Sequence, residues 1–300
     1  MIEALNLEKK FDTKSALQEL SATIENGSIY RLVGSNGAGK STFLRLIAGI
    51  YEPTSGTIKI DNENAFENIQ TKNKVFFVSD DFYFLPYSTT NQMANYLSAY
   101  YTNWSWERYE KLCTIFPINP AAKINTFSKG MKRQSALILA LSSMPDYLLL
   151  DEAFDGIDPI IRTAIRKLLS DDVANRNLTV IISSHNLREL EDFCDQVGLL
   201  HNGKVLFQRD IDDLKLGFCK VQAVFQNDFD DNILKSDLET LKIEKRESLF
   251  TIIAKGNKDD VLETINKHSP IFSEVIALTL EEVFIYEMEA VGYDYNNIIF

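Results

Sequence analysis

The chain has 300 residues, 45% hydrophobic and 25% charged, which is enough for one large domain and a smaller one and argues against wholesale disorder. With 31 basic and 43 acidic residues its net charge is −12, a balance that does not favour binding to nucleic acid or to an anionic lipid surface. The three cysteines are far apart and form no CxxC pair, which argues against a disulfide framework or a zinc site. The amino terminus lacks the basic-then-apolar pattern of a signal peptide, and no apolar run approaches the roughly 20 residues that span a bilayer.

The first two-thirds of the chain alternate short apolar, β-branched runs with helical patterns, which predicts an α/β fold. The predicted strands are Ile2–Leu7, Ile29–Val33, Thr57–Ile60, Val75–Val78, Tyr147–Leu150, Val180–Ser183 and Val197–Leu200. Asn202-Gly203, between two apolar runs, predicts a tight hairpin turn. An aromatic-rich helical pattern begins near residue 88 and predicts a helical insert at about 88–143. We expect the whole α/β domain to occupy residues 1–215.

The pattern changes at residue 216, and residues 216–300 predict a small α+β accessory domain with a ferredoxin-like arrangement. The expected elements are a strand at Lys220–Phe225, a hairpin over Ile243–Ala254, a helix at Lys258–Lys267, a strand at Phe272–Leu278 and an amphipathic helix at Leu280–Glu289.

Residues 34–42 (GSNGAGKST) carry the strongest local signal, because they fit a phosphate-binding P-loop between a predicted strand and a predicted helix. The glycines let backbone amides converge on phosphates, and the positive end of the helix faces the same anion. Lys40 would neutralise the β- and γ-phosphates and Ser41 would bind Mg²⁺. The predicted contacts to ATP here are Gly34, Ser35, Asn36, Gly37, Ala38, Gly39, Lys40, Ser41 and Thr42. The competing interpretation is a glycine-rich turn without a ligand.

An apolar predicted strand, Tyr147–Leu150, is followed by two adjacent carboxylates, Asp151 and Glu152. Neighbouring residues of a strand point in opposite directions, so the two acids serve different purposes. Asp151 suits a Mg²⁺ shell, whereas Glu152 suits the water that attacks the γ-phosphate. A solvated strand end explains such a pair equally well when it is viewed alone.

Three further segments resemble the ATPase domains of the ABC family, in the family's order and spacing over residues 1 to about 210. Residues 127–134 (FSKGMKRQ) are similar to the signature segment, 155–159 (DGIDP) to the D-loop, and His185 to the switch histidine. The resemblance implies that two copies meet head to tail, so that Ser128, Gly130 and Asp158 of one copy complete the ATP site of the other. It makes Lys40, Glu152 and His185 the catalytic residues. It also places Phe11 against adenine.

One departure from the family concerns the residue after the strand Val75–Val78. Family members usually have a glutamine there that touches Mg²⁺, and the alignment of the following residues puts Asp80 at this position. An aspartate oxygen is a suitable Mg²⁺ ligand, so the predicted metal set is Ser41, Asp80 and Asp151. The added negative charge near three phosphates predicts weaker resting affinity for ATP.

The lysine in the signature segment and the closing residues 279–288 resemble the branch of bacterial export-type ATPases. The resemblance implies that the chain lies on the inner face of the cell membrane and drives a separately encoded permease. Aromatic side chains gather at 82–87 and 95–101, in excess of what a small insert should bury, and predict a docking surface for that permease.

Two other functions remain open from sequence alone. A soluble ATPase of the same family would act on ribosomes or DNA, but the chain has one P-loop, no long coiled coil and an acidic charge. A nucleotide-gated adaptor would bind ATP without hydrolysing it, and the presence of Glu152 and His185 argues against that reading.

Overall fold

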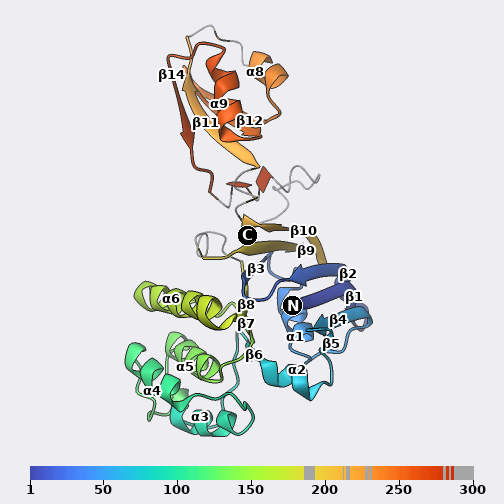
Figure 1. The fold of residues 1–300 in the computed structure, drawn as a ribbon, viewed down its shortest axis with the longest axis vertical. Helices are drawn as coiled ribbons and strands as arrows, with labels where there is room; N and C mark the ends of the chain where they lie inside the picture. Colours follow the sequence, from blue (N-terminus) through green and yellow to red (C-terminus); the bar gives the residue numbers. More distant parts are fainter. Residues whose placement is uncertain are drawn as a thin grey trace. The chain divides into compact units, whose positions relative to one another are not determined.

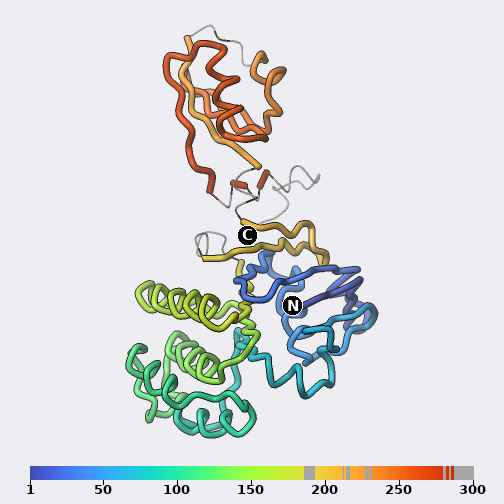
Figure 2. The backbone as a smooth tube through the Cα atoms, viewed as in Figure 1, coloured from blue at the N-terminus to red at the C-terminus, as the bar shows by residue number. Residues whose placement is uncertain are grey.

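The computed structural model describes residues 1–185, 193–211, 213, 217–226, 229, 232–279, 282–283 and 285–286. The described residues up to Gln208 form one compact unit and those from Arg209 onward form a second, so the division falls a little before the boundary expected at 215/216. Figures 1 and 2 show the path of the chain through the two units. No helix in the described part of the chain is both long and apolar enough to cross a membrane.

The first unit is built on a six-stranded sheet with the strand order β10-β9-β3-β8-β7-β6 (Figure 1). Its strands are β3 (Ile29–Val33), β6 (Val75–Val78), β7 (Tyr147–Asp151), β8 (Thr179–Ser184), β9 (Gln196–His201) and β10 (Lys204–Asp210). The pairs β9-β3, β3-β8, β8-β7 and β7-β6 are parallel, so their carboxyl ends meet at one edge. The predicted turn between β9 and β10 is confirmed, with Asn202 and Gly203 both at positive φ (47° and 77°).

A second, antiparallel sheet has the order β2-β1-β4-β5. Its strands are β1 (Ile2–Phe11), β2 (Lys14–Ile24), β4 (Ser55–Ile60) and β5 (Glu63–Asn64). Helix α1 (Lys40–Ile47) buries Phe43, Leu44 and Leu46 in one apolar core that includes residues of both sheets. This shared core fixes the start of α1 at the edge where the parallel strands end. A short helix, α2 (Ile69–Lys74), precedes β6.

Helices α3 (Thr90–Ser98), α4 (Trp106–Ile115) and α5 (Lys129–Ser142), with the 3-10 turn η1 (Ile124–Thr126), make up the helical insert between β6 and β7. Thr89 begins α3 with a reciprocal capping box to Gln92, and Ser105 caps α4. Every residue of α5 from Arg133 to Ser142 is buried, so the helix forms the centre of the insert. Helix α6 (Pro159–Arg176) follows β7.

The second unit is a β-α-β-β-α-β arrangement with an antiparallel sheet in the order β12-β13-β11-β14, which is the ferredoxin-like order. Its elements are β11 (Phe218–Val224), α8 (Asn232–Asp237), β12 (Thr240–Arg246), β13 (Leu249–Lys255), α9 (Lys258–Asn266) and β14 (Phe272–Ile276). Leu234 of α8 and Ile265 of α9 pack on one face of this sheet. Most of the helix expected at Leu280–Glu289 lies outside the described residues.

A polar cluster ties β4 to the start of β7. Asp61 accepts hydrogen bonds from the Tyr147 hydroxyl at 2.5 Å and the Lys74 ammonium at 2.8 Å, and it pairs with the terminal amine of Met1 at 2.9 Å. Burial raises the pKa of Asp61, but these hydrogen bonds outweigh burial and hold it well below the usual range. The cluster therefore stabilises the first unit only while Asp61 is ionised.

Candidate active site

The loop between β3 and α1 has a conformation that its glycines permit. Gly37 and Gly39 have φ values of 82° and 111°, which residues with a Cβ rarely adopt. A Cβ at Gly39 would lie 2.7 Å from the carbonyl oxygen of Ala16, and one at Gly34 would lie 2.2 Å from that of Leu200. Gly39 precedes α1 without a side-chain cap, so the first amides of the helix are open to an anion.

Lys40 is a buried cation in this loop, with 5% of its surface exposed. Its ammonium donates to the carbonyl oxygens of Gly34 at 2.6 Å and Ser35 at 3.1 Å, and it lies 4.0 Å from the Glu152 carboxylate. Burial lowers the pKa of Lys40, and the charges of Glu152 and Asp151 offset part of that effect. A cation this far from water is well suited to neutralise a bound polyphosphate.

Asp151 ends β7 as a carboxylate with 1% exposure. Its Oδ1 accepts hydrogen bonds from the Ser41 hydroxyl at 3.0 Å and from the Ser183 hydroxyl at 2.6 Å. The Ser41 and Asp151 oxygens are hard donors beside the loop, so this pair is chemically suited to hold a Mg²⁺ ion.

Ser183 was not among the predicted site residues. It stands opposite Asp151 in the parallel pairing of β7 with β8, and it also accepts a hydrogen bond from the Glu152 amide at 3.1 Å. The available signal was its place at the carboxyl end of the neighbouring predicted strand.

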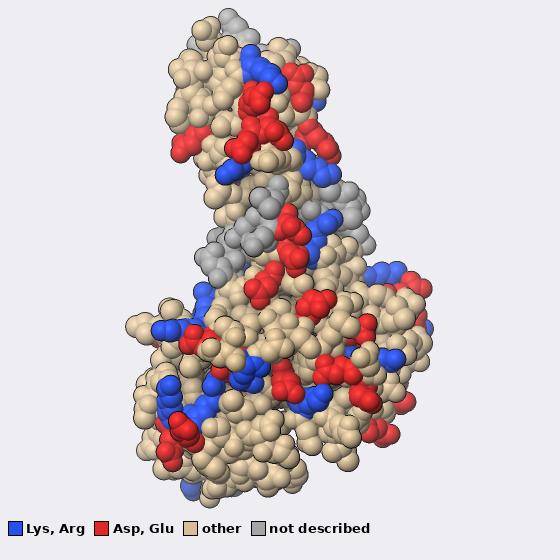
Figure 3. Space-filling model, in the orientation of Figure 1, with Lys and Arg blue, Asp and Glu red and all other residues tan. Residues whose placement is uncertain are grey.

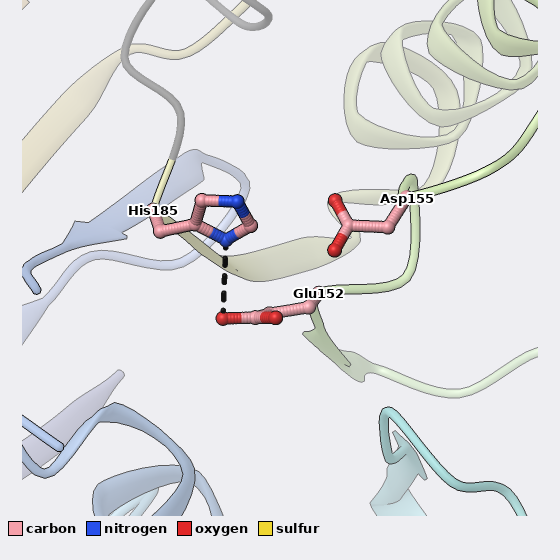
Figure 4. Close-up of side chains that lie close together, drawn as sticks. All are labelled: Glu152, Asp155 and His185. Carbon is pink, nitrogen blue, oxygen red and sulfur yellow. Dashed lines mark ion pairs between the residues drawn. The ribbon is translucent and has the colours of Figure 1, made fainter. Parts of the chain in front are cut away.

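Glu152 and His185 face each other, as Figure 4 shows. Glu152 has a positive φ of 49°, which turns the chain sharply after β7. Its Oε1 lies 3.4 Å from Nδ1 of His185. One ligand atom of Asp155 lies within 4.8 Å of those of Glu152 and His185. The structure thus adds Asp155 to two residues that the sequence had singled out.

A cavity of about 300 Å³ opens in front of this loop. It is lined by Phe11, Lys14, Ala16, Asn36, Gly37, Gly39, Lys40, Ser41, Thr42 and Glu152. Phe11 is 41% exposed, and its ring packs edge-to-face on Tyr51 with centroids 5.3 Å apart. Ala38 is buried instead, which gives it a packing role beneath the loop. Ser35 contributes one of the two carbonyl oxygens that accept from Lys40.

The signature residues form a different surface. Ser128 caps α5 by accepting a hydrogen bond from the Met131 amide at 3.2 Å, and Asp158 caps α6 by accepting one from Ile160 at 2.9 Å. A Cβ at Gly130 would lie 2.6 Å from the carbonyl oxygen of Gly156, so the turn after Glu152 packs closely on the start of α5. The described residues that line the cavity do not include Ser128, Gly130 or Asp158, so a single chain does not bring these three residues to its own P-loop.

The structure corrects the prediction for Asp80. Its carboxylate contacts the guanidinium of Arg133 and lies 3.5 Å from the ammonium of Lys129. These basic groups on α5 attract the carboxylate, and Asp80 lines a second hollow that is separate from the cavity of Ser41 and Lys40. Its role as a Mg²⁺ ligand therefore has no support from the geometry, and the argument that it weakens ATP affinity loses its basis.

Comparison with known proteins decides which family this site belongs to. The family model described as ABC transporter matches residues 17–155. The ABC transporter ATP-binding protein YtrB of Bacillus subtilis (strain 168) is 30% identical over 285 residues, 95% of this chain and 97% of that protein. The chain belongs to the ABC transporter ATP-binding proteins. It is an ATP hydrolase.

Other relatives match about seven-tenths of the chain. The bacitracin transport ATP-binding protein BcrA of Bacillus licheniformis is 32% identical, over 72% of this chain and 71% of that protein. A solved ATP-binding subunit of an ABC transporter has a TM-score of 0.66 and 26% identity, over 72% of this chain and 92% of the other. A dimeric ATP-binding cassette bound to ADP and Pi has a TM-score of 0.63 at 23% identity, over 70% and 99%, and supports the fold alone.

Proposed function

We propose that two copies of this chain close head to tail around ATP and so drive a separately encoded membrane permease, in the export direction. The observation that carries the proposal is the split site. The P-loop cavity and the first turn of α5 each suit an anion, yet Ser128 and Gly130 are not at the cavity of their own chain. A second copy would supply them, and ATP would then stabilise the closed pair because only that state offers both halves.

Each residue of the cavity has a part in the proposed hydrolysis. The loop amides and Lys40 hold the β- and γ-phosphates, and Phe11 stacks on adenine. Ser41 and Asp151 would hold Mg²⁺, which neutralises charge on the phosphates. Glu152 accepts a proton from water as the water oxygen bonds to the γ-phosphorus, and the bond from that phosphorus to the β–γ bridging oxygen breaks to release ADP. His185, 3.4 Å from Glu152, orients that carboxylate and contacts the γ-phosphate.

The permease would dock on the helical insert. Segment 79–88 borders two adjoining hollows of about 200 and 360 Å³ that share Asp81, Phe82, Phe84 and Lys132 in their lining. Tyr83 and Tyr87, on the second hollow, are 71% and 72% exposed. Figure 3 shows uncharged side chains over the neighbouring α3, whose sequence has no charged residue. Exposed aromatic side chains beside an uncharged surface suit a short helix from a membrane protein.

Recovery from native membranes tests this function. Glu152→Gln should trap the ATP-bound state, and we expect the tagged variant to retain a multi-span protein in near-equal amount after gentle solubilisation. Tyr83→Asp should abolish that recovery while ATP binding stays intact. Ile69→Asp is the matched control, because Ile69 is 76% exposed on α2, outside both hollows. Ribosomal proteins, DNA-bound factors or no partner would overturn the proposal in favour of a soluble ATPase.

We base the export direction and the location on the inner face of the cell membrane on similarity to two relatives. One is BcrA, a bacitracin transport protein. The other is the linearmycin resistance protein LnrL of Bacillus subtilis (strain 168), which is 29% identical over 69% of this chain. Deletion of the gene should lower the resistance of its host to at least one antibiotic in a panel that includes bacitracin and linearmycin. The wild-type chain, but not Glu152→Gln, should restore that resistance. Unchanged resistance across such a panel, with reduced uptake of a nutrient, would point to import.

A further inference from the structure

Arg133 stands at a junction between two parts of the molecule that the proposed mechanism must connect. It lies on α5 with 5% of its surface exposed. One guanidinium nitrogen, Nη2, donates to the carboxylate of Asp80, and the other, Nη1, donates to the backbone carbonyl of Asp155. A guanidinium presents its donors in a fixed planar fork, so its two contacts hold their acceptors in a defined relation.

On one side of Arg133 lies the docking surface. Asp80 and Asp81 follow β6 and line the first hollow, together with Lys129, Lys132 and Arg133 itself. Asp80 is half exposed, at 49%, and Lys129 approaches the same carboxylate oxygen at 3.5 Å. The charge of Asp80 thus compensates the buried guanidinium, since a buried charge without a partner is strongly destabilising.

On the other side lies the turn 152–158, which carries the catalytic carboxylate. Gly130 approaches the carbonyl oxygen of Gly156 so closely that a Cβ would lie 2.6 Å from it, and the Arg133 fork holds the carbonyl of Asp155 next to it. The Asp155 carboxylate is within 4.8 Å of the ligand atoms of Glu152 and His185. A displacement of the Arg133 guanidinium would therefore act on the turn that carries Glu152.

We propose that Arg133 is a positioning residue that links the segment after β6, through Asp80 and the Asp155 carbonyl, to the placement of Glu152. The inference rests on the proposed docking at segment 79–88 and deepens it: a permease helix in that groove would act on hydrolysis through this guanidinium. Asp80 then serves as the acceptor that anchors Arg133, which gives the aspartate a function other than binding a metal ion.

The physical link is tested first, on the full chain without a permease, by hydrogen exchange of the amides of 153–158. Asp80→Asn should increase their exchange, because a neutral amide holds Arg133 less firmly than a carboxylate does. Arg133→Lys should do the same, since a lysine keeps the charge but loses the fork. Asp171→Asn is the matched control: Asp171 is exposed on α6, lines neither hollow and has no ion pair within the described residues, so exchange should match wild type. Unchanged exchange in Asp80→Asn would overturn the proposal.

Steady-state kinetics then test the consequence for Glu152. Arg133→Gln and Asp80→Asn should each lower kcat for ATP by about two- to thirtyfold, the range found along coupling networks, with KM unchanged. The double variant should lose no more than Arg133→Gln alone, because both changes break one connection. Effects that multiply, or a loss confined to thermal stability with kcat intact, would overturn the relay.

The permease itself separates this inference from the function on which it rests. If a reconstituted permease stimulates wild-type hydrolysis, that stimulation should be lost in Asp80→Asn and kept in Asp171→Asn. If the permease has no effect on the wild type, the docking proposal fails, and the relay is judged by exchange and kcat alone. Stimulation retained in full by both Asp80→Asn and Arg133→Gln would refute the relay while leaving the transport function intact.

Discussion

Replacement of Ser183 by alanine removes a hydroxyl that serves both catalytic-site acids. That hydroxyl donates to Asp151 at 2.6 Å and accepts from the Glu152 amide at 3.1 Å, in a position with 1% exposure. Asp151 is equally buried and would keep the Ser41 hydroxyl at 3.0 Å. A hydrogen bond to a charged group contributes about 1.5–3 kcal/mol, so Ser183→Ala should lower the free energy of unfolding by that amount. For a unit of this size the change corresponds to about 3–12 °C in Tm.

Tryptophan fluorescence during denaturation by urea measures this effect in the first unit alone, because both tryptophans, Trp104 and Trp106, lie in or beside α4. Ser143→Ala is the control: Ser143 is also 1% exposed, but its hydroxyl donates to the neutral carbonyl of Ala140 at 2.8 Å. The control should cost no more than about 1 kcal/mol. We further expect Ser183→Ala to lower kcat by about 10–100-fold, as for other residues that orient a metal ligand. A variant within about 0.5 kcal/mol of wild type and with normal kcat would refute this reasoning.

Glu152→Gln should lower kcat by about 10²–10⁴-fold in steady-state assays while equilibrium binding of ATP is kept, because only the proton acceptor is lost; a loss under tenfold would contradict the assignment. In the nucleotide-free protein, Gly39→Ala should lower the midpoint of unfolding by urea more than Gly37→Ala does. A Cβ at Gly39 would lie 2.7 Å from a backbone oxygen, whereas a Cβ at Gly37 would have no atom within 4 Å. Equal midpoints for the two variants would contradict this prediction. Asp61→Asn should have a lower free energy of unfolding than wild type at pH 7, and this difference should shrink below about pH 4. The reason is that a carboxylate with a depressed pKa contributes stability that is lost as the pH falls through that pKa. A difference independent of pH would exclude the Lys74 pair as its source.

The parallel sheet was predictable because each buried strand is a short apolar run and the P-loop marks the end of β3. Strand β2 was missed, since its inward residues Leu17, Leu20, Ala22 and Ile24 do not keep a strict period of two. Glu19, at a φ of 48°, inserts an irregularity between Leu17 and Leu20 that breaks the alternation. Helix α8 escaped prediction because only Leu234 of its six residues is buried.

At the active site, the sequence predicted those residues that belong to a local motif. It did not predict contacts between residues of elements that are distant in the sequence. The pairing of Ser41 with Asp151 follows from two motifs at one sheet edge, and the structure brings them to 3.0 Å. Asp80 was placed by analogy with a glutamine, but Arg133, which is distant in sequence, attracts its carboxylate. No period or spacing reveals that a side chain on α5 reaches back to the end of β6. Ser183 likewise becomes visible only when β8 is aligned with β7.

The shared site between two chains is the central claim, and mixing two inactive variants tests it most directly. Lys40→Ala disables the P-loop, and Ser128→Arg disables the start of α5, with circular dichroism as the check that each variant folds. When one Lys40→Ala chain pairs head to tail with one Ser128→Arg chain, one of the two ATP sites contains both defects and the other contains none. We predict that each variant alone is inactive and that an equimolar mixture regains up to about a quarter of wild-type ATP hydrolysis. No recovery on mixing, with both variants folded and able to associate, would contradict a site shared between chains.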